Sequence, residues 1–91
     1  MTKESGIANT NFTDDGGSTW ELKYYIQTYD QGTDNVAYGI RVEKIGTGEI
    51  VSEETNGLTH SYEEAKGWIN KMAAGKVTPL SLHAIVDDLV G

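Results

Sequence analysis

The residues best suited to chemistry in this chain are two histidines and a scatter of carboxylates. His83 and Asp87 are four positions apart, so on a helix they would share one face. A histidine oriented by a carboxylate is half of a catalytic triad, which also needs a nucleophile within reach of the histidine. No activated nucleophile can be identified, so an exposed helical pair is the better interpretation. We therefore expect no catalytic residues and a protein that is not an enzyme.

A metal or cofactor site is not expected either. His60 has four glutamates within seven positions of it, but their spacing matches no zinc or calcium pattern. Residues 30–34 depart from a calcium-binding loop, because a glycine replaces the second carboxylate and no glutamate closes the loop. The chain has no cysteine, which excludes thiolate ligands and thiol catalysis.

Acidic residues and tyrosines are the candidates for an interaction site. Tyr25 and Tyr29, on the outer face of the first predicted strand, would supply aromatic contact area. Asp87 and Asp88 lie near the end of a predicted helix, where the helix macrodipole disfavours negative charge. Five glutamates with no Lys or Arg between them would form an acidic patch if their elements begin close together: Glu49, Glu53, Glu54, Glu63 and Glu64. The alternative interpretation is a solvated surface that keeps an acidic protein soluble.

The charge balance limits the kinds of partner. Fourteen acidic residues against seven basic ones give a net charge of −7 over 91 residues. Nucleic-acid backbones and anionic membranes reward a basic surface, so we expect neither as a direct partner and favour a basic protein partner. The first twenty residues hold no apolar block of the signal-peptide kind, and no run approaches a membrane span. Together with the lack of cysteines, this predicts a cytoplasmic protein.

The pattern of apolar residues divides the chain in two. Residues 1–18 are rich in Thr, Asn, Asp, Gly and Ser, which predicts a flexible N-terminal arm that is dispensable for folding. Residues 19–91 are expected to form a single α+β domain. Alternating apolar residues predict strands at 20–27 and 36–43, and a third strand at 49–53.

Two helices are predicted after the strands. Ser61 has the position of an N-cap for a helix that ends at Gly75, and Trp68 falls on its apolar stripe as an expected core anchor. Thr78 and Pro79 are a favourable start for a second helix. The predicted fold is therefore a three-stranded antiparallel meander with two C-terminal helices packed on one face, in two layers.

Side-chain parity predicts which residues face the helices. The apolar sets of the first two strands share a face only if opposed positions sum to an even number, as Ile26 does with Tyr38 or Ile40. The same rule predicts that Ile50 points inward. An edge strand without a partner could pair with a second copy of the chain, so the sequence does not exclude a homodimer.

Two segments resemble a known family. Residues 38–42 (Tyr-Gly-Ile-Arg-Val) and residues 77–89 are similar to the small Firmicutes family called domain of unknown function 6514. The resemblance covers residues 22–90 and implies a bacterial, cytoplasmic origin, but it implies no activity. That family often carries an acidic residue where this chain has Ala84.

These observations favour a non-enzymatic interaction or regulatory module that acts through its acidic, tyrosine-bearing surface. The alternative is an acidic inhibitor encoded by a phage or mobile element, which would counter a defence system by imitating a phosphate backbone. Small size, negative charge and the lack of cysteines fit both.

Overall fold

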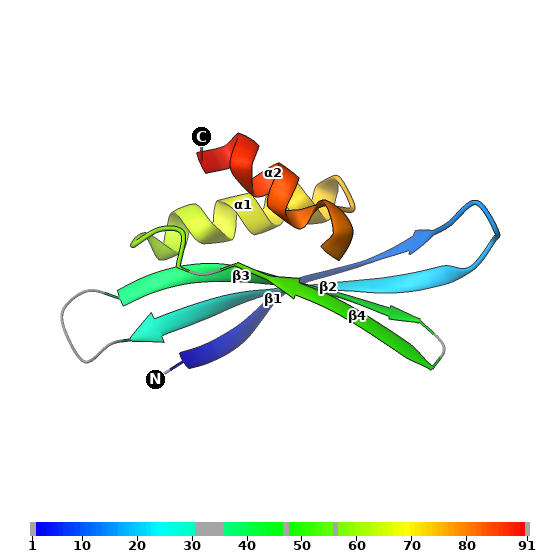
Figure 1. The fold of residues 1–91 in the computed structure, drawn as a ribbon, viewed down its shortest axis with the longest axis horizontal. Coiled ribbons are helices and arrows are strands. Elements are labelled where there is room, and N and C mark those ends of the chain that lie inside the picture. The colour runs from blue at the N-terminus through cyan, green and yellow to red at the C-terminus, as the bar shows by residue number, and fades with distance from the viewer. Residues whose placement is uncertain (1, 31–35, 47, 56, 91) are drawn as a thin grey trace.

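A four-stranded antiparallel sheet and a layer of helices make up the fold (Figure 1). The computed structural model describes residues 2–30, 36–46, 48–55 and 57–90. The strands pair in chain order, and both helices lie on one face of the sheet in Figure 1. The α+β class is therefore confirmed. The elements are β1 (Thr2–Thr13), β2 (Thr19–Asp30), β3 (Val36–Gly46), β4 (Glu49–Glu54), α1 (Tyr62–Ala74), the 3₁₀ turn η1 (Pro79–Ser81) and α2 (Leu82–Val90).

The prediction of three strands is wrong, because residues 2–13 form a fourth. β1 pairs antiparallel with β2 along its whole length. Ile7, Ala8 and Phe12 of β1 pack, partly buried, against the core. Residues 2–13 carry too few apolar side chains to bury much surface by themselves. Pairing with β2 supplies the surface against which these side chains pack. Residues 2–13 therefore form an edge strand, whereas a flexible arm was predicted over residues 1–18.

The polar residues after β1 form the turn of a β-hairpin. The Asp14 carboxylate accepts hydrogen bonds from the backbone N–H groups of Gly16 and Ser18 at 3.0 and 2.9 Å, and from Trp20 Nε1 at 3.1 Å. These bonds, that of Trp20 first, hold the pKa of Asp14 below its ordinary value. Gly17 adopts a φ of +86°, which favours glycine.

The register of β2 and β3 follows the predicted parity. Ile26 lies opposite Ile40, so the alternating apolar side chains of both strands point to the helices. The fully or nearly buried core comprises Leu22, Tyr24, Ile26, Ile40, Val42, Ala65, Ile69, Met72, Leu82 and Val86.

The facing of β4 is the reverse of the prediction. Gly46 pairs with Glu49, so opposed positions of β3 and β4 sum to an odd number. A connection of two residues imposes this sum, whereas the prediction carried over the even sum of the first hairpin. Ile50 therefore lies on the face away from the helices, with 65% of its surface exposed, and Glu53 lies opposite Val42 on the helix face.

The first helix begins as predicted. The Ser61 hydroxyl accepts a hydrogen bond of 3.2 Å from the backbone N–H of Glu64, which caps the helix. The buried stripe of α1 comprises Ala65, Ile69 and Met72. Trp68, expected as a core anchor, is only half-buried at the margin of the core.

The passage between the helices departs from the prediction in two details. Lys76, with a φ of 53°, takes the left-handed conformation after α1, whereas Gly75 has a φ of −89°. Pro79 opens a 3₁₀ turn, and the α-helix proper begins at Leu82.

One tyrosine joins the two layers. Tyr24 of β2 is fully buried, and its hydroxyl donates a hydrogen bond of 2.7 Å to the carbonyl oxygen of Val77, just beyond α1. Burial raises the pKa of Tyr24 to about 12. The hydroxyl is therefore protonated at neutral pH and satisfies the Val77 carbonyl in the link between the helices.

Candidate functional site

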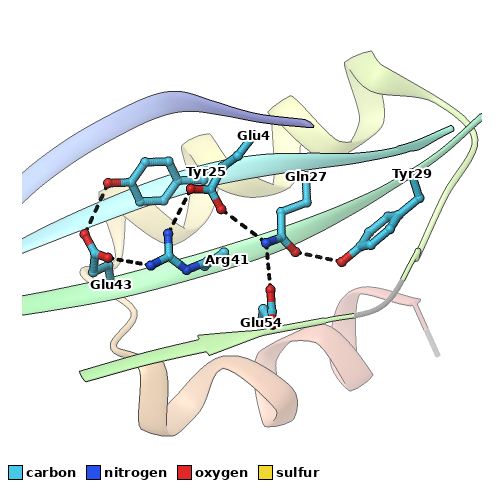
Figure 2. A network of polar contacts seen from close by, with 7 residues as sticks. All are labelled: Glu4, Tyr25, Gln27, Tyr29, Arg41, Glu43 and Glu54. Carbon is cyan, nitrogen blue, oxygen red and sulfur yellow. Dashed lines mark hydrogen bonds and ion pairs between the residues drawn. The ribbon is translucent and has the colours of Figure 1, made fainter. Parts of the chain in front are cut away.

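The face of the sheet away from the helices carries a connected set of polar side chains (Figure 2). Strand register places these residues on one face, since Tyr25 lies opposite Arg41 and Arg41 lies opposite Glu54. The set, here called the outer-face network, comprises Glu4, Tyr25, Gln27, Tyr29, Arg41, Glu43 and Glu54. It draws residues from all four strands.

Arg41 is the centre of the outer-face network. Its Nη1 lies 2.9 Å from Glu4 Oε1 and its Nη2 lies 2.6 Å from Glu43 Oε2. The guanidinium also lies over the ring of Tyr25, 5.1 Å from the centroid, in a cation–π contact. Burial lowers the pKa of Arg41, but the carboxylates of Glu4 and Glu43 outweigh burial, so the net pKa is raised. The arginine is therefore a fixed positive charge.

Gln27 links the remaining members. Its side-chain amide nitrogen donates to Glu4 Oε2 at 3.1 Å and to Glu54 Oε2 at 2.6 Å. Its amide oxygen accepts a hydrogen bond of 2.7 Å from the Tyr29 hydroxyl. Only 7% of Gln27 is exposed. A buried amide whose donors and acceptor are all used has one orientation, so Gln27 holds two carboxylates in place.

Both tyrosines of the network are neutral hydrogen-bond donors. The Tyr25 hydroxyl donates to Glu43 Oε1 at 3.2 Å. Burial raises the pKa of Tyr25 and of Tyr29, and the nearby carboxylates of Glu43 and Glu54 raise them further. Each ring is half-buried, so part of its surface can contact a partner.

The outer-face network has a net negative charge. It contains three carboxylates and one guanidinium, and the guanidinium forms ion pairs with two of these carboxylates, Glu4 and Glu43. Among the described residues, Glu54 accepts a hydrogen bond from the neutral amide of Gln27 and makes no ion pair. Carboxylate oxygens beside tyrosine rings are suited to bind cationic groups.

The structure divides the predicted site residues among several places. Tyr25, Tyr29 and Glu54 come together in the outer-face network. Glu53 lies on the helix face, where its carboxylate is 3.4 Å from His83 Nε2. The other predicted residues are all exposed: Glu49 at the start of β4, Glu63 and Glu64 in the first turn of α1, and Asp87 and Asp88 in α2. Glu53 and Glu54 do not share a face, because adjacent residues of a strand face opposite ways.

Four members of the network were missed by sequence reasoning. The alternation of side chains in the sequence already places Gln27, Arg41 and Glu43 on the outer face. Alternation does not show, however, which side chains meet across strands. Glu4 was hidden because its segment was predicted to be an arm. Only the pairing of β1 with β2, which sets Glu4 opposite Gln27, brings this carboxylate to Arg41.

The histidines do not build a reactive centre. His83 contacts Glu53 of β4 and not Asp87, and His60 Nδ1 lies 3.0 Å from the Val36 carbonyl oxygen. Within the described parts of the chain, no group of three or more His, Cys, Asp or Glu side chains is placed to hold a metal ion. The segment that was compared with a calcium-binding loop, residues 30–34, lies outside the described residues except for residue 30.

The fold and the network define a class of small α+β domain with helices on one face of a four-stranded sheet and polar side chains on the other. The chain belongs to the family of unknown function DUF6514, whose model matches residues 3–91. The resemblance seen in the sequence is confirmed, and the match includes β1. No curated protein and no solved structure matches the chain. Among the described residues, no helix is long and apolar enough to cross a membrane.

Proposed function

We propose that this chain is a non-enzymatic interaction module of the bacterial cytoplasm, and that it binds a basic protein partner across the outer face of its sheet. The observation that carries the proposal is the outer-face network, in which hydrogen bonds and ion pairs hold three carboxylates and one arginine on a face that no described helix covers. The excess negative charge on this face matches the chain's net charge of −7.

Order within the network supports a binding role. Association costs free energy for every flexible side chain that must be fixed at an interface. Gln27 and Arg41 already hold the carboxylates of Glu4, Glu43 and Glu54 by hydrogen bonds and ion pairs. A cationic partner would therefore meet acceptors that are in place before it arrives.

The alternative, a phage or mobile-element inhibitor that imitates a phosphate backbone, is supported by small size, the lack of cysteines and the net charge. Such imitation needs carboxylates arranged in a continuous row, by analogy with the regular spacing of phosphates. Here Glu53 and Glu54 face opposite sides of the sheet, and Glu63 and Glu64 lie on α1. The geometry therefore favours the interaction module.

The test compares two variants that remove the same charge from different places. Glu4→Gln with Glu54→Gln takes two charges from the network, while each glutamine oxygen can still accept from Gln27. Glu63→Gln with Glu64→Gln takes two charges from exposed positions on α1. Proteins captured from an extract of the source cells are quantified for the wild type and both variants.

We expect one basic protein to be captured by the wild type and by the α1 variant, and to be reduced several-fold with the network variant. Equal loss with both variants would mean that only total charge matters. Loss with the α1 variant alone would place the interaction on the helix layer and contradict the proposal.

A further inference from the structure

β4 is an edge strand whose protection against pairing with another chain is the negative charge of its three glutamates. It pairs with β3 on one side only, and all six of its residues are exposed. Natural edges are blunted by proline, by charged side chains, lysine above all, or by a β-bulge. β4 contains neither proline nor lysine and its pairing with β3 is regular, so its three glutamates are the charges that a partner strand must match. The other edge strand, β1, is interrupted by a register shift between Gly6 and Ala8.

The hydrogen bonding of β3 shows which backbone groups of β4 are free. Thr55, directly after β4, donates its backbone N–H to Ile40 O at 2.9 Å. In an antiparallel ladder the backbone groups of alternate residues point toward the partner strand and away from it. The N–H and C=O groups of Ile50, Ser52 and Glu54 therefore point away from β3. Within the described residues, no other element makes a backbone hydrogen bond to these three.

A second copy of the chain is a poor occupant of this edge. In an antiparallel pair of two β4 strands, the outward-pointing residues Ile50, Ser52 and Glu54 must lie opposite one another, so opposed positions sum to an even number. One such register places Glu49 opposite Glu53 twice, and the next places Ile50 opposite Glu54 and Val51 opposite Glu53. Like charges directly opposite each other destabilise a strand pair. Neither register gives the glutamates an opposite charge, whereas a strand with Lys or Arg at the opposed positions does.

We propose that the free edge of β4 accepts an extended segment of a basic partner as a fifth, antiparallel strand. Main-chain hydrogen bonds to Ile50, Ser52 and Glu54 would bind it, and alternating side-chain contacts would select its sequence. The matching segment has Lys or Arg opposite Glu49, Glu53 and Glu54 and apolar residues opposite Ile50 and Val51. These two side chains are 65% and 42% exposed. This inference rests on the proposed function, because it names how the basic partner is held.

The probe is a blocked six-residue peptide, Lys-Lys-Thr-Val-Ile-Lys, which supplies this pattern in the antiparallel direction. Its control has Glu in place of each Lys. Both are titrated into the full-length, isotopically labelled chain, and exchange of each backbone amide hydrogen is measured. We expect exchange to slow several-fold at Ile50, Ser52 and Glu54, with little change at Val51 and Glu53, which already bond to β3.

Two substitutions at Ser52 distinguish the main-chain contribution to peptide binding from the side-chain contribution. Ser52→Pro removes the outward N–H but no bond to β3, and proline is tolerated at such edge positions. Ser52→Ala removes the hydroxyl and keeps the N–H. Loss of a main-chain hydrogen bond, together with the bulk of the ring, should weaken peptide binding roughly tenfold in Ser52→Pro, and Ser52→Ala should bind within about twofold of the wild type.

Equal binding by the two Ser52 variants, or slowed exchange without the alternating pattern, would overturn the inference. So would a wild type that binds neither peptide. If Ser52→Pro fails to fold, the exchange pattern of the wild type decides alone. If Ser52→Pro captures the cellular partner normally while the Glu4 and Glu54 variant does not, strand addition is wrong and the proposed function stands.

Discussion

At the scale of single residues, Tyr24 couples the stability of the fold to alkaline pH. The folded chain keeps the Tyr24 proton up to a pKa of about 12, while the unfolded chain releases it near the ordinary value of 10. The stability due to this group is therefore fully present below about pH 10 and is lost as pH rises toward 12. The loss is about 1.4 kcal/mol per pH unit in that interval.

Tyr24→Phe tests this coupling. It removes the donor to the Val77 carbonyl, so we expect the free energy of unfolding to fall by about 1–2 kcal/mol at pH 7. The decline between pH 10 and 12 should become shallower, though not flat, because the pKa values of Tyr25 and Tyr29 are also raised. Denaturant midpoints measured from pH 7 to 11.5 report both effects. Tyr62→Phe, at an exposed ring, should leave the stability at pH 7 unchanged.

At the scale of elements, β1 is the least expected part of the fold, and its contribution can be measured. Phe12 is half-buried against the core, and Lys44 Nζ lies 5.4 Å from the centroid of its ring. We expect Phe12→Ala to reduce the free energy of unfolding by about 1–2 kcal/mol, less than the loss for a fully buried phenylalanine.

Asn11→Ala is the matched control for β1. Asn11 is the exposed neighbour on the same strand, so its loss should change the free energy of unfolding by no more than about 0.5 kcal/mol. Urea unfolding of the two variants gives the comparison. Equal values for both, near that of the wild type, would mean that residues 2–13 behave as a flexible arm in solution.

At the scale of the whole molecule, the net charge of −7 should act mainly on how fast a basic partner arrives. Exposed charges are screened over about 8 Å at physiological ionic strength, and such fields change association rates more than dissociation rates. Raising the salt concentration from roughly 0.05 to 0.5 M should therefore slow association several-fold and leave dissociation nearly unchanged. Stopped-flow or surface-based kinetics with the captured partner measure both rates. An association rate that does not change with salt concentration would mean that the negative charge serves only to keep the protein soluble.

The sequence by itself determined the α+β class, the strands β2 and β3 with the parity of their pairing, and the start of α1. Each of these rests on a local signal: alternation of apolar residues at 20–26 and 36–42, or the Ser61 cap. Local signals suffice where an element carries its own apolar face.

Tertiary structure alone decided the fourth strand, the facing of β4 and the membership of the outer-face network. β1 acquires its burial from β2, and the facing of β4 depends on a connection of two residues that shifts the parity by one. The network then follows from both, because Glu4 and Glu54 reach Gln27 from opposite edges of the sheet, 23 and 27 positions away in the sequence. Side chains that meet across strands are brought together by register, which is a property of paired strands and is not written in either one.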